Sequence, residues 1–219
     1  MEERKHIVIL AAGEFPKHEV PLRVLREADF VVCCDSAYAS LTTYDSLLTT
    51  PYVVIGDGDS LSEYDKQQLG DRWIEVVEQD YNDLHKAMDY ATSHFLIINT
   101  QFAIVGATGK REDHTLGNIS YLVTFAEEHP GLELEMLTDY GRLCAMRGSR
   151  TFSCFPRQQI SIFTMNPDLP IYSTGLRWPL DGFHARRWWQ ASLNEALGTE
   201  FSLRSEGCLV VFQTYEAKS

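Results

Sequence analysis

The sequence predicts an α/β protein in which a parallel, Rossmann-like sheet carries helices on both faces and a small antiparallel β-sandwich domain follows. Up to about residue 145, short apolar runs alternate with segments of helical period. Beyond that residue the segments become short and β-branched or aromatic, and turn residues separate them. We therefore predict an α/β domain over residues 1–145 and a β-sandwich domain over residues 146–219.

The first part contains apolar runs that we interpret as strands. They are nearly continuous in Val, Ile and Leu instead of alternating with polar residues, which is typical of strands buried on both faces. The runs cover residues 6–12, 30–35, 52–57, 73–78, 102–107 and 132–139.

The intervening segments 37–47, 61–69, 83–95 and 114–127 are predicted helices. The third has the clearest period, because its apolar residues recur at i, i+3, i+4, i+7 and i+11 and so share one helix face. Asn82 is a suitable N-cap for this helix, and Asp83 in its first turn complements the helix dipole. Strands that alternate with helices in this way indicate a parallel sheet.

The second part contains candidate strands at residues 151–155, 159–163, 171–176, 183–191, 200–204 and 208–215. Asn, Pro, Asp and Gly residues lie between them, which is typical of the turns of an antiparallel domain. This part is also rich in tryptophan and other aromatic residues. Trp178, Trp188, Trp189, Phe183 and Tyr172 are either core residues of the sandwich or a stacking surface for a flat or cationic ligand.

Charge is distributed unevenly along the 219 residues, which carry 19 Lys and Arg and 31 Asp and Glu, a net charge of −12. Residues 1–145 hold 11 bases and 25 acids (11 − 25 = −14), and residues 146–219 hold 8 bases and 6 acids (8 − 6 = +2). This distribution argues against binding to nucleic acid or to an anionic membrane surface. No apolar run approaches the roughly 18 residues of a membrane span. Five cysteines without a C-x-x-C motif indicate reduced thiols in a cytoplasmic protein.

Polar and small residues follow the predicted strands, where an open parallel sheet binds its ligands. Asp57 and Asp59 lie in Gly56-Asp57-Gly58-Asp59-Ser60 after the third strand, and Asp80 and Asp83 follow the fourth. Asp-Gly pairs are also common in simple turns. Several acids at one sheet edge would repel one another, however, so a divalent cation such as Mg²⁺ is the natural compensation.

Residues 106–114 form a glycine-containing loop that leads into a helix, with the sequence Gly-Ala-Thr-Gly-Lys-Arg-Glu-Asp-His. Backbone N–H groups at such a helix start favour phosphate, and Lys110 and Arg111 add positive charge. The loop has neither Walker A nor G-x-G-x-x-G spacing. The alternative is an ordinary loop with exposed basic residues. Lys86 similarly either forms a surface pair with Asp83 or extends into the site.

Taken in order, these segments resemble the thiamine pyrophosphokinase family. The resemblance extends from about residue 6 to residue 213 and rests on Cys34-Asp35-Ser36-Ala37, residues 56–60, 79–87 and 106–114, Thr174-Gly175-Leu176-Arg177-Trp178-Pro179-Leu180 and Ser192-Leu193-Asn194-Glu195. It implies an α/β catalytic domain, a β-sandwich that binds thiamine, and a homodimer with active sites at the subunit interface. It also implies transfer of a diphosphoryl group from ATP to thiamine, with Mg²⁺ as cofactor and AMP as the second product.

The same resemblance assigns roles to residues of this chain. Asp57, Asp59 and Asp83 would hold Mg²⁺. Residues expected along the nucleotide are Asp35, Ser36, Gly109, Lys110, Arg111 and His114, and residues expected to act in catalysis are Asp80, Asp83, Lys86, Arg111 and Asp113. Gln79, Asn82, Ser192 and Asn194 would contact the acceptor substrate. The chain departs from the family pattern at Ser36-Ala37, where glycines are usual, at Asn82, where Thr is common, and at Leu193, which separates Ser192 from Asn194.

Three other functions are compatible with the same residues. The acceptor could be a different hydroxymethyl heterocycle, such as a pterin. The acidic residues could serve a metal-dependent phosphohydrolase, or the chain could be a nucleotide or thiamine sensor without activity. Phosphoryl-type transfer depends mainly on positioning and charge neutralisation, and carboxylates, a basic side chain and a phosphate-binding loop supply both.

Overall fold

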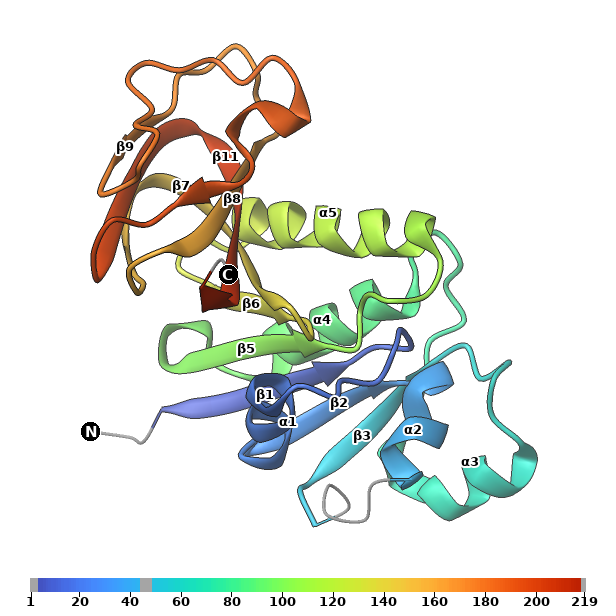
Figure 1. Ribbon diagram of the computed structural model, residues 1–219. Coiled ribbons are helices and arrows are strands. Elements are labelled where there is room, and N and C mark those ends of the chain that lie inside the picture. Colours follow the sequence, from blue (N-terminus) through green and yellow to red (C-terminus); the bar gives the residue numbers. More distant parts are fainter. Residues whose placement is uncertain (1–3, 44–48, 218–219) are drawn as a thin grey trace. The chain divides into compact units, whose positions relative to one another are not determined.

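The computed structural model describes residues 4–43 and 49–217, which form two compact units (Figure 1). The first unit comprises Met1–Tyr121 and Gly131–Asp139, and the second comprises Leu122–Pro130 and Tyr140–Ser219. Helix α5 (Glu112–Glu128) therefore contributes residues to both units. The expected boundary between residues 145 and 146 falls within strand β7 (Gly141–Ser153).

A parallel sheet forms the centre of the first unit, with the strand order β6-β5-β1-β2-β3-β4. The strands are β1 (Lys5–Leu10), β2 (Phe30–Cys34), β3 (Tyr52–Gly56), β4 (Trp73–Glu75), β5 (Thr100–Val105) and β6 (Glu133–Leu137). Each coincides with a predicted run, although β4 is shorter than expected. The inner strands are almost completely buried, which explains their continuous apolar sequences.

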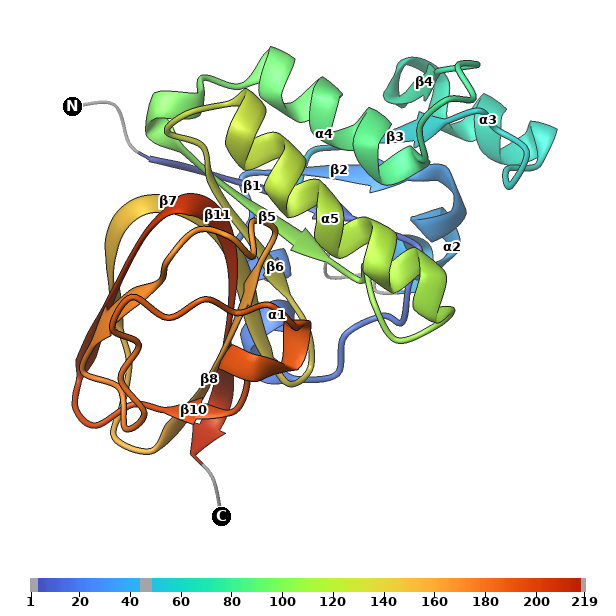
Figure 2. The same cartoon turned by 90° about the horizontal axis from the view of Figure 1, so that it is seen from above.

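Helices cover both faces of this sheet, as predicted (Figures 1 and 2). Helix α4 (Asp83–His94) contacts β1, β2 and β3, and α1 (Glu19–Arg26) contacts β5. Helices α2 (Tyr38–Thr43) and α3 (Glu63–Leu69) follow β2 and β3 along the chain. The helix predicted over residues 37–47 is observed as a 3₁₀ turn at Asp35–Ala37 followed by α2, and its residues 44–47 lie outside the described residues.

Helix α1 has no counterpart among the predicted helices. It is only 8 residues long and includes Pro21. Its N-cap is His18, whose Nδ1 atom accepts a hydrogen bond from the backbone N–H of Val20 at 3.2 Å. Because Ser, Thr, Asp and Asn are the usual N-caps, the ordinary signal for the start of a helix is absent from this segment.

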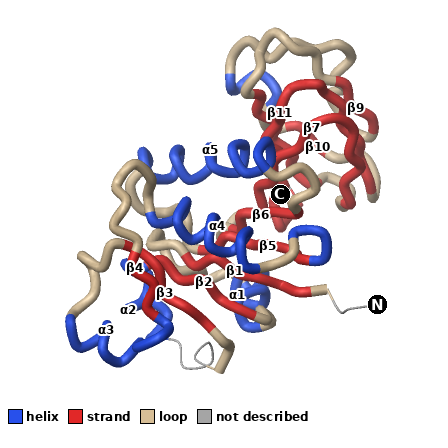
Figure 3. The backbone as a smooth tube through the Cα atoms, turned by 180° about the vertical axis from the view of Figure 1, so that it is seen from behind, coloured by secondary structure: helices blue, strands red, loops and turns tan. Residues whose placement is uncertain are grey.

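The second unit is an antiparallel β domain, as predicted (Figure 3). Its strands are β7, β8 (Gln158–Thr164), β9 (Tyr172–Thr174), β10 (Asn194–Glu195) and β11 (Glu200–Ala217). The order is β10-β8-β11-β7, and β9 pairs with the first half of β11. Strand β11 covers two predicted strands as one, with an irregularity between Ser205 and Leu209.

The strand predicted over residues 183–191 is wrong. Phe183 forms an isolated bridge with Ile171, and a 3₁₀ helix occupies Trp188–Ala191. Most residues of the core come from β7, β8 and β11, where the rings of Phe152 and Phe201 stack with centroids 4.9 Å apart, and Ala185 and Ala191 of this segment also belong to the core. Among the helices of the described residues, none has the length and apolar character needed to cross a membrane.

Candidate active site

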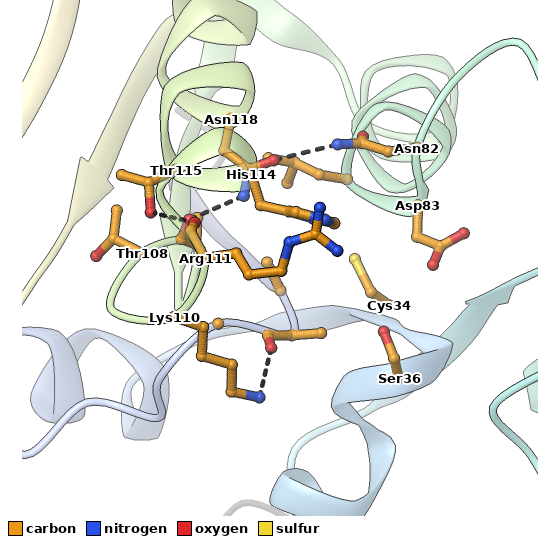
Figure 4. Close-up of a pocket in the computed structure, with 15 residues that line it drawn as sticks. Cys34, Ser36, Asn82, Asp83, Thr108, Lys110, Arg111, His114, Thr115 and Asn118 are labelled. Atoms are coloured by element: carbon orange, nitrogen blue, oxygen red, sulfur yellow. Dashed lines mark hydrogen bonds between the residues drawn. The ribbon is translucent and has the colours of Figure 1, made fainter.

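The loops that follow β1, β2 and β5 and the first turns of α4 and α5 line a cavity of about 300 Å³ in the first unit (Figure 4). Because the strands are parallel, their carboxyl ends meet at this edge of the sheet. The cavity is lined by Ala11, Ala12, Gly13, Cys34, Ser36, Asn82, Asp83, Leu84, Ala107, Thr108, Lys110, Arg111, His114, Thr115 and Asn118.

Three carboxylates gather at the ends of β2 and β3. Asp35, Asp57 and Asp59, called the acidic cluster below, each offer an oxygen within 4.8 Å of the others. Asp35 is almost fully buried and accepts a hydrogen bond from the backbone N–H of Gly58 at 3.1 Å. A Cβ atom on Gly56 would lie 2.5 Å from the Asp35 Cγ atom, so only glycine leaves room for this carboxylate. Oxygen donors at this spacing suit a small divalent cation such as Mg²⁺.

Gln79 contacts the acidic cluster directly. Its side-chain amide donates a hydrogen bond to Asp57 Oδ2 at 3.0 Å, and this bond is the main cause of a lowered pKa for Asp57. The backbone N–H of Asp59 donates to Asp57 Oδ1 at 3.2 Å. Because its pKa is lowered, Asp57 stays ionised over the physiological pH range. Asp80, by contrast, is exposed, and its backbone N–H donates to the side chain of Glu78.

Asp83 and Lys86 lie in the first turn of α4. Lys86 Nζ is 3.5 Å from Asp83 Oδ1. The Lys86 residue is 6% exposed and the Asp83 side chain is 29% exposed, so this is a partly buried pair and not the surface pair that was one of the two interpretations. Burial, followed by the carboxylate of Asp35, raises the pKa of Asp83 to about 6. The cavity wall thus carries the carboxylate of Asp83, whose ionisation is disfavoured, and the buried ammonium of Lys86 lies next to that carboxylate.

Residues 106–113, called the glycine loop below, are held against the segment that follows β1. The backbone N–H of Gly13 donates to Gly106 O at 2.5 Å, and that of Glu14 donates to Thr108 O at 2.7 Å. Gly109 has a φ of +88°, a conformation that favours glycine. Lys110 Nζ donates to Ala12 O at 2.8 Å. These three hydrogen bonds therefore hold the loop to residues 12–14.

The residues around the start of α5 supply further polar groups. Arg111 and Asp113 form an exposed pair, with Arg111 Nη2 2.5 Å from Asp113 Oδ2. Their mutual hydrogen bond raises the pKa of Arg111 and lowers that of Asp113. Asp113 Oδ1 also accepts from the backbone N–H of His114 at 2.9 Å. In Figure 4 the Arg111 side chain extends across the cavity between α5 and Ser36.

Two asparagines connect α4 to α5. Asn82 is the N-cap of α4, and its Oδ1 accepts from the backbone N–H of His85 at 3.0 Å, as predicted for a cap. Asn82 Nδ2 donates to Asn118 Oδ1 at 3.2 Å, and Asn118 Nδ2 donates to Ala107 O at 2.8 Å. Sequence reasoning did not single out Asn118. Its only sequence signal is a spacing of four residues from His114, which places both on one side of α5.

Ser192 and Asn194 belong to the second unit, where their hydrogen bonds are local. Ser192 Oγ donates to Trp189 O at 2.7 Å. Asn194 is buried, and its amide both accepts from the Trp178 N–H at 3.1 Å and donates to Trp178 O at 2.7 Å. Asn194 thus fixes the loop that presents Trp178.

The three tryptophans of this region are not core residues, so the core interpretation is wrong for them. Trp178, Trp188 and Trp189 are 53%, 56% and 68% exposed. Phe183 is partly buried against the core, and Tyr172 lies under the guanidinium of Arg204, 4.0 Å from its ring centroid. The exposure of these indole rings is compatible with the alternative, a stacking surface for a flat or cationic ligand.

Comparison with known proteins points to one family. The model described as thiamin pyrophosphokinase, catalytic domain, matches residues 22–134, and the model for the thiamin pyrophosphokinase substrate-binding domain matches residues 141–212. Thiamine pyrophosphokinase 1 of rice is 28% identical over 144 residues, which are 60% of this chain and 53% of the rice protein. Thiamine pyrophosphokinase 3 of rice is 30% identical over 145 residues, which are 60% of this chain and 52% of that rice protein. The chain spans about half the length of these relatives.

Solved structures share the fold. Thiamin pyrophosphokinase from Candida albicans has a TM-score of 0.82 at 18% identity and covers 97% of this chain and 90% of its own. Thiamin pyrophosphokinase from Geobacillus thermodenitrificans has a TM-score of 0.76 at 23% identity, with coverage of 96% and 97%. At these identities the similarity establishes the architecture alone.

Proposed function

Since the chain belongs to the thiamin pyrophosphokinase family, we propose that it transfers a diphosphoryl group from ATP to the hydroxyl of thiamine, which gives thiamine diphosphate and AMP. The observation that carries this proposal is the cavity in the first unit. The acidic cluster lies at the neighbouring strand ends, and the glycine loop and Arg111 border the cavity. Lys86 lies next to Asp83, which lines the cavity. Such an arrangement suits the polyphosphate of a nucleotide.

Mg²⁺ is the proposed cofactor, and the donor set fits it. Asp57 and Asp59, with Asp35 or Asp83, would hold the ion, which supplies charge neutralisation for the phosphate oxygens when bound. The hydrogen bond from Gln79 keeps Asp57 ionised and oriented. The buried ammonium of Lys86 lies 3.5 Å from Asp83, which lines the cavity, and its positive charge would stabilise the phosphate charge nearby.

Positioning is the main contribution of the remaining residues. Gly109, Lys110, Arg111 and His114 would lie along the phosphates, and Ser36 along the nucleotide. Asp113 would act through its pair with Arg111, which holds the guanidinium in place. Asp80 or Asp83 would accept the proton of the thiamine hydroxyl, although an acid bound to a cation is a poor base. We therefore assign no dedicated general base.

We propose that the second unit carries residues that contact thiamine, and that Gln79 and Asn82 of the first unit border the point of transfer. The exposed rings of Trp178, Trp188 and Trp189 offer stacking partners for a flat, cationic heterocycle. Ser192 would contact the acceptor, and Asn194 would act by fixing Trp178. We also propose a homodimer with shared active sites, supported by this exposed aromatic surface, and a cytoplasmic location, supported by five free cysteines.

A product assay tests the function. With ATP and Mg²⁺ present, AMP is expected to form only when thiamine is added, in a one-to-one ratio with thiamine diphosphate. AMP formation with a pterin alcohol and not with thiamine would change the acceptor. Release of phosphate at one rate with or without an acceptor would indicate a phosphohydrolase. Ligand-induced thermal stabilisation without turnover would indicate a sensor.

A thermal titration tests the metal site. At a free Mg²⁺ concentration tenfold above its Kd, binding should stabilise the fold by about 1.4 kcal/mol, which raises Tm by about 3–6 °C. The Asp57→Asn variant should lose most of this rise, because the acidic cluster loses one charged donor. Asp71→Asn, which removes an exposed acid outside the cluster, serves as the matched control. An equal rise in Asp57→Asn and wild type would place the ion elsewhere.

A further inference from the structure

Asn118 differs from the other polar residues of the cavity in being buried and using both ends of its amide. Its residue is 8% exposed, although it lies on the wall of the cavity. Its Nδ2 donates to Ala107 O at 2.8 Å, and its Oδ1 accepts from Asn82 Nδ2 at 3.2 Å. Figure 4 shows the second of these bonds crossing from α5 to α4.

The two partners of Asn118 belong to the two halves of the proposed phosphate site. Ala107 is the second residue of the glycine loop, whose other backbone bonds, from Gly13 and Glu14, come from the segment that follows the neighbouring strand β1. Asn82 caps α4 through the backbone N–H of His85. The first turn of α4 carries the Asp83–Lys86 pair. A single side chain thus connects the loop to the helix that presents the buried cation.

The chemistry of this position requires a carboxamide. A donor is needed toward the Ala107 carbonyl and an acceptor is needed toward Asn82, and only an amide of this length offers both. Aspartate keeps the acceptor but places a charge beside a carbonyl oxygen. Leucine has a similar volume and offers neither group, so it leaves two buried polar partners without their bonds.

We propose that Asn118 is a positioning residue for the transfer reaction, because its amide sets the spacing between the glycine loop and the N-terminus of α4. This inference rests on the proposed function. Catalysis by positioning is sensitive to small displacements, and a shift of about 1 Å can reduce the rate by about 10²-fold. A residue that merely stabilised the fold would affect Tm and leave turnover of the folded enzyme unchanged.

Steady-state kinetics of Asn118→Leu and Asn118→Asp test the proposal, with Leu116→Ala as the control on the exposed side of the same helix. We expect kcat to fall about 10²-fold in both Asn118 variants at a temperature where far-ultraviolet circular dichroism shows them folded. KM for thiamine should change little, and Leu116→Ala should behave like wild type. A normal kcat in both folded variants would overturn the proposal.

A double-mutant cycle tests whether Asn118 acts through its hydrogen bond to Asn82. Asn82→Ser keeps a capping oxygen for α4 but removes the donor to Asn118. If the two residues act as one connection, the double variant with Asn118→Leu should be no slower than the slower single variant. Losses that multiply would show that the two residues act independently, which contradicts the connection.

Hydrogen–deuterium exchange provides a readout that does not need turnover. In Asn118→Leu, peptides covering residues 79–86 and 106–113 should exchange faster than in wild type, while peptides of β1 and β2 keep their protection. Unchanged exchange in both segments would overturn the positioning role even if the wild-type protein transferred no diphosphoryl group. If the wild-type protein forms no thiamine-dependent AMP, but Asn118→Leu shows the expected difference in exchange, the proposed function alone would be overturned.

Discussion

Replacing Asp83 by asparagine is expected to reduce turnover by about 10²–10³-fold, the usual effect of removing one preorganised charged group from a reaction site. Asp83 lies on the cavity wall and holds the buried ammonium of Lys86 at 3.5 Å. Asparagine keeps the shape of the side chain but removes its charge. Lys86 would then lose its ionic partner, and the proposed Mg²⁺–phosphate site would lose one carboxylate.

The stability of the same variant separates a functional loss from a folding defect. Burial and Asp35 raise the pKa of Asp83 to about 6, above the value of about 3.9 in an unfolded chain. The folded state therefore favours the protonated acid, and this contribution to stability is lost as pH rises from about 4 through about 6. Without metal at pH 8, the Asp83→Asn variant should consequently unfold at a Tm no lower than wild type.

Measurements of kcat at saturating ATP and of Tm in a chelator, at pH 5 and pH 8, check both parts. Asp71→Asn is the control, since Asp71 is exposed and does not line the cavity. Near-normal turnover of Asp83→Asn would remove Asp83 from both the metal set and the catalytic set. A large drop in Tm at pH 8 would contradict the sign of its pKa shift.

Replacing Gly13 by alanine is expected to damage both stability and activity. A Cβ atom at this position would lie 2.5 Å from Thr108 O and 2.8 Å from Thr108 N, and it would also clash with Gly106 O. These are backbone atoms of the glycine loop and cannot move aside as a side chain can. We expect a loss of about 1–3 kcal/mol, hence a Tm lowered by about 2–12 °C, and turnover at least about 10²-fold lower.

Replacing Gly117 by alanine is expected to have the opposite effect on stability. Gly117 lies within α5, and a Cβ atom there would have no neighbour within 4 Å. Because alanine restricts the unfolded chain and favours helix, this variant should gain about 0.5–1 kcal/mol. Denaturant unfolding of the two variants side by side measures the difference. A Gly13→Ala protein as stable and active as wild type would show that the glycine loop is not held as described.

The parallel sheet was predictable because its strands are buried on both faces and therefore carry continuous apolar sequences. Helix α4 was also predictable, because a good N-cap at Asn82 is followed by apolar residues with a clear helical period. Helix α1 was missed because His18 is an unusual cap. The segment around Trp188 was misassigned because aromatic residues that suit a strand also suit an exposed contact surface.

Part of the candidate site was predictable for a related reason. Strand ends of a parallel sheet converge, so Asp57, Asp59 and residues 106–114 could be placed together without knowledge of the fold. The connection from Asn82 to Asn118 was not accessible, because it joins residues 36 positions apart and depends on the packing of α4 against α5. Likewise, the burial of Asp35 depends on Gly56, a neighbour supplied by the adjacent strand.

The position of strand β11 in the sheet affects how the second unit folds during synthesis. Although it follows all the other strands in sequence, it lies between β7 and β8 and also pairs with β9. During synthesis, β7 and β8 therefore leave the ribosome before the strand that joins them exists. The edges of β7 and β8 that pair with β11 stay unpaired until residues 200–217 have been synthesised. Folding of this unit therefore depends on late, long-range pairing, and the unpaired edges can aggregate before that.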